Sequence, residues 1–187
     1  MATIKGVGVD NLGDTGFKIE RNGFVIYVDP TEAMQGSKKA DVILLTAEDR
    51  YCPKNKILDI LKEDTLLLAA PSVLDDDFCE MAAADFINQK GIEIKGIPGI
   101  DKNSELVVGY MITMNGVKMY HPGDTRSLPK VVDLKSEGVD AALLPDMSEK
   151  HAANLVREFI PKAVFPLNGS SRKLKGALKD LSGIEFL

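Results

Sequence analysis

Two short polar stretches of the chain contain residue types that carry out metal or acid–base chemistry. The stretch TAEDRYC contains Asp49 and Cys52, and the stretch HPGDT contains His121 and Asp124. A thiolate, an imidazole and carboxylates together can coordinate a single Zn²⁺. An imidazole and a carboxylate can also act as base and acid without a metal. If the fold brings the stretches together, these residues predict a mononuclear metal site or a metal-free acid–base site.

Each of these side chains also has a purely structural interpretation, which we favour. Asp49 can cap a helix that follows it, and Cys52 can pack as a small apolar group. Asp124 can cap its own turn by accepting hydrogen bonds from backbone N–H groups. His121 ends an expected strand, and a histidine there without a partner motif is more often a packed residue than a catalyst. Both interpretations stay open at this point.

Arg50 lies in the middle of the first stretch and places a cation close to its carboxylates. A carboxylate left alone in a cleft is costly, and a planar guanidinium can satisfy it with paired hydrogen bonds. Arg126 offers a second cation, two residues after Asp124. We predict that Arg50 is the residue that pairs with Asp124.

The other reactive or charged groups are interpreted as structural. His151, the second of two histidines, falls in the first turn of an expected helix and should be exposed without a functional role. Cys79 lies in a stretch rich in Ala and Met and should be a buried apolar filler. The basic stretch SSRKLKGALK (170–179) is interpreted as the solvated face of a C-terminal helix. The sequence contains no Gly-x-Ser-x-Gly nucleophile elbow and no dinucleotide-binding glycine loop between a strand and a helix.

The composition is that of a globular protein. The chain has 187 residues, 44% of them hydrophobic and 27% charged, and its net charge is −5. This size predicts a single domain over residues 1–187. The acidic balance argues against nucleic-acid binding, which needs clustered cations. No apolar run approaches the ~18 residues that span a bilayer, and the start of the sequence lacks a signal-peptide pattern. Two cysteines make no disulfide framework, so we expect a cytoplasmic protein without membrane contact.

The elements that must position the two stretches are a run of strands, followed by strands that alternate with helices. Period-two or continuous apolar patterns predict strands at 4–10, 16–21, 23–30, 40–46, 65–71, 92–99, 139–146 and 162–169, and a hairpin over 106–124 around Asn115-Gly116. Helical spacing predicts helices at 53–64, in part of 73–91, at 148–160 behind a Ser148 N-cap, and within 170–181, with a short turn or helix in 128–138. No internal repeat is evident.

Several of the expected strands end in short polar loops. These loops lie at 28–30, 44–51, 120–125, 143–148 and 165–169. Functional sites collect in crevices beyond the ends of strands. The loops therefore predict where a site would lie, and both reactive stretches are among them.

The order of these stretches resembles the metallo-β-lactamase-fold hydrolases over nearly the whole chain. The similar segments are 12–30, 40–46, 107–125, 138–146 and 160–168, and the most specific is a hairpin that ends in His-x-Gly-Asp-Thr. The resemblance implies an α/β (α+β) fold, a four-layer αββα sandwich of the metallo-β-lactamase type. Members of that family typically bind one or two zinc, manganese or iron ions at one edge of the sheets. The metal-bound water then attacks an ester, amide or phosphodiester.

The sequence departs from this family at almost every metal ligand. The family's Thr-His-x-His-x-Asp-His loop falls on TAEDRYC, and no histidine precedes His121, so no shift of the alignment restores an imidazole. Asp124 matches the bridging carboxylate and is the one ligand retained. The positions equivalent to the ligands, and to a Gly-His near the start of the family's domain, hold Asp14, Ala47, Asp49, Tyr51, Cys52, Asp124 and Asn168.

The sequence thus favours a family member that keeps the scaffold and has lost the hydrolytic centre. It predicts no cofactor, and a binding, assembly or regulatory role in which the chain pairs with itself or with another protein. The alternative is an enzyme with an unconventional site built from Asp49, Cys52, His121 and Asp124, holding one zinc or manganese ion or acting as a metal-free acid and base. A third and weaker hypothesis is a nucleic-acid accessory role, because some relatives process RNA or DNA; the acidic net charge counts against it.

Overall fold

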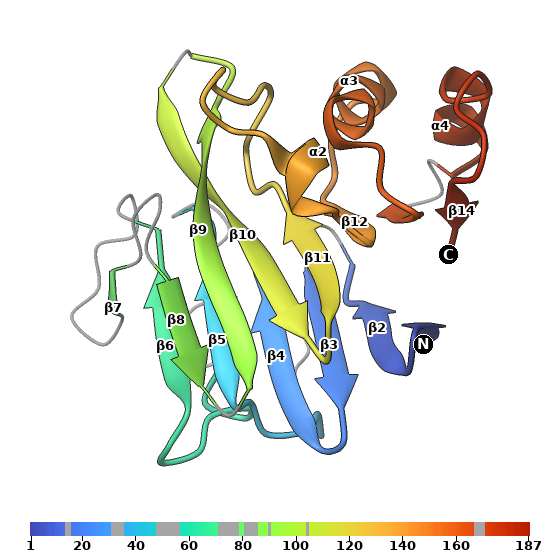
Figure 1. The fold of residues 1–187 in the computed structure, drawn as a ribbon. Helices are drawn as coiled ribbons and strands as arrows, with labels where there is room; N and C mark the ends of the chain where they lie inside the picture. Colours follow the sequence, from blue (N-terminus) through green and yellow to red (C-terminus); the bar gives the residue numbers. More distant parts are fainter. Residues whose placement is uncertain are drawn as a thin grey trace. The chain divides into compact units, whose positions relative to one another are not determined.

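A computed structural model gives the arrangement of the chain as two compact units, Met1–Ala82 and Ala83–Leu187 (Figure 1). The structure describes residues 1–13, 16–30, 36–47, 57–70, 79–80, 86–89, 91–103, 105–166 and 171–187. No helix in these ranges is both long and apolar enough to cross a membrane.

The first unit is built on a sheet in which the described strands follow one another in sequence order, from β1 to β7. The first four strands pair antiparallel, and β4 to β7 pair parallel. The strands are β1 (Ala2–Ile4), β2 (Val7–Asn11), β3 (Phe17–Arg21), β4 (Phe24–Val28), β5 (Val42–Leu45), β6 (Leu66–Ala69) and β7 (Cys79–Glu80). Because β4, β5 and β6 run parallel, the carboxyl ends of these three strands lie at the same edge of the sheet.

The continuous apolar run of β5 is explained by its central position. All four of its residues are buried, because β4 and β6 flank it and apolar side chains cover its face. Ile57 and Ile60 pack in that cover with Tyr27 and Ile43. The prediction of a covered strand at 40–46 is confirmed.

The predicted helix over 53–64 ends earlier than expected, because Ile57 is helical and the described residues after it are not. Residues 58–60, 63 and 64 form turns, while 53–56 lie outside the described residues. Thr65 explains the difference, since its hydroxyl accepts a hydrogen bond from the N–H of Lys62 and donates one to the carbonyl of Ala40. Local bonds of this kind compete with the helical ones.

The second unit is also built on a sheet whose described strands follow sequence order, from β8 to β14 (Figure 1). Pairing is antiparallel from β8 to β11 and parallel from β11 to β14. The strands are β8 (Phe86–Gln89), β9 (Ile92–Ile100), β10 (Leu106–Met114), β11 (Val117–His121), β12 (Ala141–Leu144), β13 (Ala163–Pro166) and β14 (Glu185–Phe186). The hairpin prediction over 106–124 is confirmed, with φ of 52° at Asn115 and 71° at Gly116, as a type I′ turn requires.

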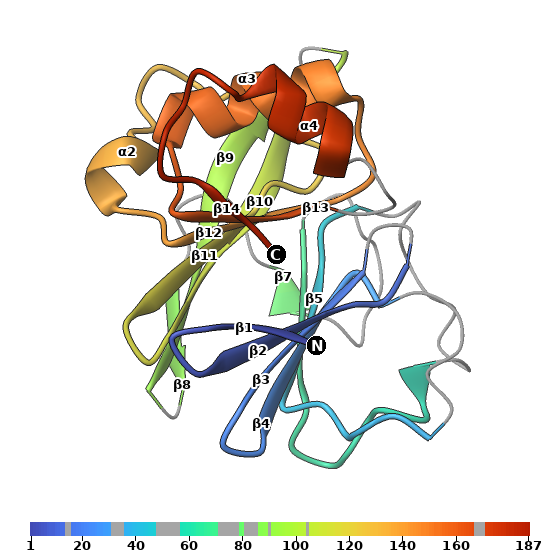
Figure 2. The same ribbon diagram turned by 90° about the vertical axis from the view of Figure 1, so that its right-hand side faces the viewer.

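Three helices cover one face of this second sheet (Figure 2). They are α2 (Leu134–Glu137), α3 (Glu149–Phe159) and α4 (Ser171–Ala177). Ser148 caps α3 as predicted, because its hydroxyl accepts a hydrogen bond from the N–H of His151. Leu155, Phe159 and Leu174 are among the side chains that pack the helices against the sheet.

The prediction of helix within 73–91 is wrong at the residues that the structure describes there. Cys79–Glu80 form β7 and Phe86–Gln89 form β8. A tight turn at Gly91, which has a φ of 76°, returns β8 onto β9, so that Ile87 pairs with Ile94. Strand pairing with a distant partner overrides the local helical spacing.

A buried aspartate stabilises the parallel pairing in the first unit. Asp41, just before β5, accepts a 2.7 Å hydrogen bond from the N–H of Val25 in β4. Its other carboxylate oxygen lies 2.6 Å from Nζ of Lys62. This contact raises the pKa of the Lys62 ammonium.

The same arrangement recurs in the second unit. Asp140, just before β12, accepts a 3.0 Å hydrogen bond from the N–H of Lys118 in β11, and its second oxygen lies 2.7 Å from Nζ of Lys162. In each unit a hairpin leads into a parallel strand, and an aspartate joins the two strands to a lysine that precedes the next one. The two units therefore share a repeated design that was not evident in the sequence.

Candidate functional site

In the first unit, the end of β5 is held in place by a buried carboxylate. Oδ1 of Asp29 accepts a 2.8 Å hydrogen bond from the N–H of Thr46, and Oδ2 accepts a 2.7 Å bond from the Thr46 hydroxyl. Asp29 is fully buried at the end of β4 and has a φ of 43°. Its own N–H donates to the carbonyl of Leu44 at 2.8 Å. These bonds orient the backbone at the residue where TAEDRYC begins.

Ala47 is the next residue, at the position that the resemblance aligns with the family's first ligand. It is half-buried. Its methyl group offers no lone pair, so it cannot bind a metal or transfer a proton. The Asp29–Thr46 contact therefore holds the start of the loop while the loop's first ligand position lacks a ligand.

Most of the other predicted site residues of the first unit, and one of the second, lie outside the described residues. They are Asp14, Asp49, Tyr51, Cys52 and Asn168, together with Arg50. The Asp49, Cys52, His121 and Asp124 cluster and the Arg50–Asp124 pair therefore stay predictions. The side chain of Cys79 is likewise not described.

In the second unit, His121 is the last residue of β11 and is fully buried. Its Nδ1 lies 3.3 Å from the N–H of Gly123, which donates to it. A nitrogen that accepts a hydrogen bond carries no proton, so the ring proton of the neutral imidazole is assigned to Nε2. The backbone carbonyl of His121 lies against Gly109, where an added Cβ would be 2.7 Å from it.

Thr125 ends the HPGDT turn in a tightly packed position. It is fully buried, and a Cβ added to Gly99 in β9 would lie 1.9 Å from its Oγ1. Burial raises the pKa of the Tyr120 phenol, and the neighbouring Thr125 hydroxyl lowers it by a smaller amount. The two hydroxyls are close but lack hydrogen-bond geometry, and neither has a full hydrogen bond to any residue that the structure describes. The sequence contained no signal for this packing.

Asp124 is half-buried, between Gly123 and Thr125, which are both buried. The turn that presents it is closed by a 3.2 Å hydrogen bond from the N–H of Thr125 to the carbonyl of Pro122. The N–H of Arg126 donates to the carbonyl of Ile100 at 2.7 Å, which ties the far side of the turn to β9. The fold thus presents one carboxylate on a turn that is fixed at both ends.

His151 lies in the first turn of α3, as predicted, but it is half-buried and not exposed as expected. Its Nδ1 is 2.9 Å from the hydroxyl of Ser148. The imidazole is therefore part of the N-terminal cap of the helix. Among the described residues, no three His, Cys, Asp or Glu side chains lie close enough together to hold a metal ion.

Residues 9–168 match the family model of the β-lactamase superfamily domain. The match covers most of the chain and both structural units, and the chain belongs to this family. The family assignment and the mixed α/β fold class made from the sequence are confirmed. Members of this fold family usually bind zinc or iron.

Solved structures show the same fold at low sequence identity. The chain is similar to Igni18, a metallo hydrolase from Ignicoccus hospitalis, with a TM-score of 0.73 and 16% identity over 97% of this chain and 94% of that one. It is similar to CmlA, a diiron β-hydroxylase from Streptomyces venezuelae, with a TM-score of 0.71, 12% identity and all of this chain covered. The chain spans about half the length of CmlA, 54%. Zn²⁺-bound PqqB from Methylobacterium extorquens has a TM-score of 0.56 and 12% identity over 92% of this chain and 84% of that one.

The residues present do not fit the several-imidazole metal centre of the family. The sequence holds two histidines. His121 is buried with Nδ1 accepting a backbone hydrogen bond, and His151 is bonded to Ser148. Ala47 stands where the resemblance places the first ligand. A site with several neutral imidazoles and their supporting partners cannot be built from these groups.

Proposed function

We propose that this protein is a metallo-β-lactamase-fold protein without the family's hydrolytic centre, and that it acts in binding, assembly or regulation. The observation that carries the proposal is the combination of a retained scaffold and a lost ligand at the end of β5. Asp29 and Thr46 hold the backbone there with two hydrogen bonds, and the residue that follows is Ala47. The proposal includes no bound metal or other cofactor, a location in the cytoplasm, and a partner that is a second copy of the chain or another protein.

The shortage of imidazoles supports the proposal chemically. Lowering the pKa of a bound water to near neutrality requires a metal ion held firmly with an open position. The family obtains this with several histidines, and the two histidines of this chain make other contacts. A single carboxylate at Asp124 cannot replace them.

The test is the metal content of the protein, purified without chelator and measured by elemental analysis. The proposal predicts well below one equivalent of zinc, manganese or iron per chain. One equivalent that is lost in both Cys52→Ala and Asp124→Ala would overturn it and establish the alternative mononuclear site. Glu105→Ala, an exposed carboxylate outside the two polar stretches, is the matched control and should leave the metal content unchanged.

Activity gives a second measurement for the same proposal. A screen of esters and phosphodiesters with added Zn²⁺ or Mn²⁺ should show no turnover above buffer. Turnover that is lost in His121→Asn or Asp124→Asn, while both variants keep the wild-type melting temperature, would assign an acid–base or metal-assisted enzyme instead.

A further inference from the structure

Charge is distributed unevenly along the chain. Residues 1–82 contain nine Lys and Arg and fifteen Asp and Glu, whereas residues 83–187 contain fourteen and thirteen. Within the second part, residues 150–179 contain seven basic residues and one acidic residue. An acidic protein thus carries a local excess of positive charge in the segment that forms α3 and α4.

Helix α4 presents part of this excess as a regular row. Leu174 and Leu178 point into the core and are 1% and 2% exposed. Arg172 and Lys175 are exposed at positions i and i+3, which share one side of the helix, and Lys179 is exposed in the turn that directly follows α4. The helical hydrogen bonding continues to Leu178, whose N–H donates to Leu174. We call Arg172, Lys175 and Lys179 the basic stripe.

The neighbouring cations are already neutralised. Arg157 pairs with Asp180 at 2.7 Å, and Lys162 pairs with Asp140 at 2.7 Å. Lys173 lies 3.5 Å from Glu149. The Lys173–Glu149 contact ties α4 to α3, and each of the three cations has a counter-charge in its own unit, so their charge is not available for a partner.

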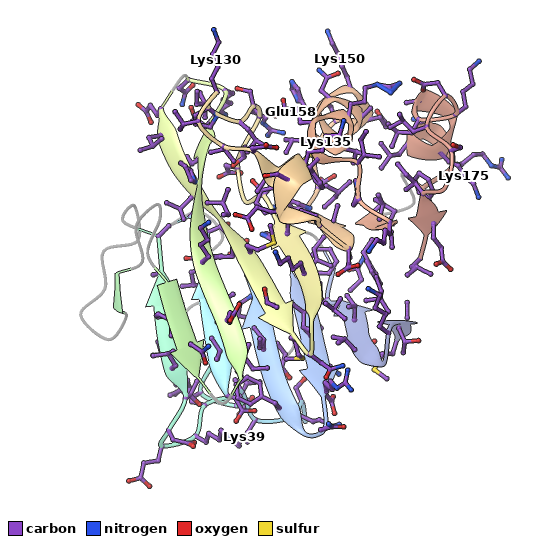
Figure 3. All side chains as sticks on the ribbon, in the orientation of Figure 1. Lys39, Lys130, Lys135, Lys150, Glu158 and Lys175 are labelled. Carbon is purple, nitrogen blue, oxygen red and sulfur yellow. The ribbon has the colours of Figure 1, made fainter. Side chains whose placement is uncertain are left out.

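The basic stripe, by contrast, has no ion-pair partner within the described parts of the chain. Lys175 makes one contact of another kind, with its Nζ 5.6 Å from the centre of the Phe186 ring. Figure 3 shows Lys175 projecting outward from α4. Three cations in a row without counter-charges are stabilised by any anionic surface that can lie along them.

The surroundings of the stripe indicate the chemistry of that surface. The large apolar side chains that are most exposed among the described residues are Met1, Leu58, Leu106, Val131 and Ile160, and none of them belongs to α4. A partner that binds along the stripe would therefore be held by charge and not by apolar contact. A nucleic acid extends well beyond three charges and would be repelled by a chain with a net charge of −5. A short acidic segment, by contrast, can contact the stripe without approaching the acidic remainder of the chain.

We propose that the basic stripe of α4 binds an acidic segment of a partner polypeptide, through carboxylates that pair with Arg172, Lys175 and Lys179. This inference specifies the chemistry of the partner in the proposed binding role, and it therefore rests on that role. It uses none of the residues of the two polar stretches. Its failure would leave the metal measurement unaffected, and a metal found in the protein would leave the binding measurement unaffected.

The experiment measures fluorescence anisotropy of a labelled polyglutamate peptide and, separately, of a labelled oligo(dT) with the same charge. The full-length protein should bind the peptide at low salt and release it at about 0.3 M salt, where charges are screened within a few ångströms. The variant Arg172→Glu/Lys175→Glu/Lys179→Glu should bind about tenfold more weakly, because it replaces three attractive exposed charges with three repulsive ones.

The matched control changes the net charge by the same amount elsewhere. Lys39→Glu/Lys130→Glu/Lys135→Glu replaces three exposed lysines that do not belong to α4 and that Figure 3 labels, and it should bind the peptide as the wild type does. Equal weakening in both triple variants, with unchanged melting temperatures, would overturn the assignment to the stripe. Tighter binding of oligo(dT) than of the peptide would overturn the choice of an acidic polypeptide, and no binding of either would overturn the proposal as a whole.

Discussion

The carboxylate of Asp29 accepts hydrogen bonds from both the backbone N–H and the hydroxyl of Thr46, at 2.8 and 2.7 Å. The contact joins the end of β4 to the end of β5, and all of its atoms are in buried residues. Asp29 also holds a φ of 43°, a conformation that Asp and Asn tolerate better than other residues with a Cβ. Asp29 therefore contributes both to the stability of the fold and to the position of the backbone at the start of TAEDRYC.

Asp29→Ala should be strongly destabilising. It removes two hydrogen bonds and leaves a buried N–H and a buried hydroxyl unsatisfied, which costs about 3 kcal/mol. Asp29→Asn should cost less, since its amide oxygen still accepts a bond and Asn tolerates the positive φ. Urea denaturation of the two variants measures the difference. Equal losses would show that the hydrogen bonds are not the source of the effect.

Gly99→Ala should be strongly destabilising. The new Cβ would lie 1.9 Å from Oγ1 and 2.7 Å from Cβ of Thr125, so β9 or the turn has to move, at a cost of about 1–3 kcal/mol. The double variant with Thr125→Gly should recover part of the loss. Gly176→Ala is the control: nothing lies within 4 Å of the new methyl group in α4. That change should stabilise the protein by up to ~1 kcal/mol.

Glu137 should make a small contribution to stability that is lost in acid. Lys95 and, to a lesser degree, Lys118 hold the pKa of the Glu137 carboxyl below its usual value. A depressed folded-state pKa means that the contribution is present above the unfolded-state pKa and is lost as the pH falls through the folded-state value. Glu137→Gln should therefore be less stable than the wild type at neutral pH, by at most ~1 kcal/mol because the pair is exposed. Thermal melts across the acid range should converge. A difference that persists at the lowest pH would exclude the charge as its cause.

The contribution of Glu158 to stability should change with pH in the opposite direction to that of Glu137. Burial raises the pKa of its carboxyl, and the backbone N–H of Leu128 offsets this in part. A raised folded-state pKa means that the folded protein binds more protons than the unfolded chain between the two pKa values, so stability falls as the pH rises through that window. Glu158→Gln keeps an acceptor for Leu128 and should flatten this dependence in the same melts. A variant whose pH profile matched the wild type would refute the shift.

Local signals were sufficient for those elements whose stability is local. Asn115-Gly116 predicted the β10–β11 turn, because only residues that tolerate positive φ fit there, and Ser148 predicted the start of α3. Residues 58–64, 79–80 and 86–89 were wrongly predicted as helical, because contacts with distant parts of the chain decide their structure. Thr65 bonds to the carbonyl of Ala40, and β8 pairs with β9.

The candidate site likewise has some features that the sequence predicted and others that only the fold decided. Its shortage of imidazoles and its match to the family's motifs were evident from residue types, which no folding can change. The contacts of His121 with Gly123 and of Thr125 with Gly99 had no signal in the sequence, since each depends on how closely two backbone segments approach.

The sequence by itself determined the family, the shortage of histidines and the acidic balance, because these depend only on which residues are present and in what order. The tertiary structure alone decided three other features. It buried Asp29 against Thr46, it repeated the Asp41 arrangement at Asp140, and it left Arg172, Lys175 and Lys179 without counter-charges in the part of the chain it describes. A charge or a polar atom is satisfied by whichever group the fold places within about 3 Å, and that neighbour lies far away in the sequence.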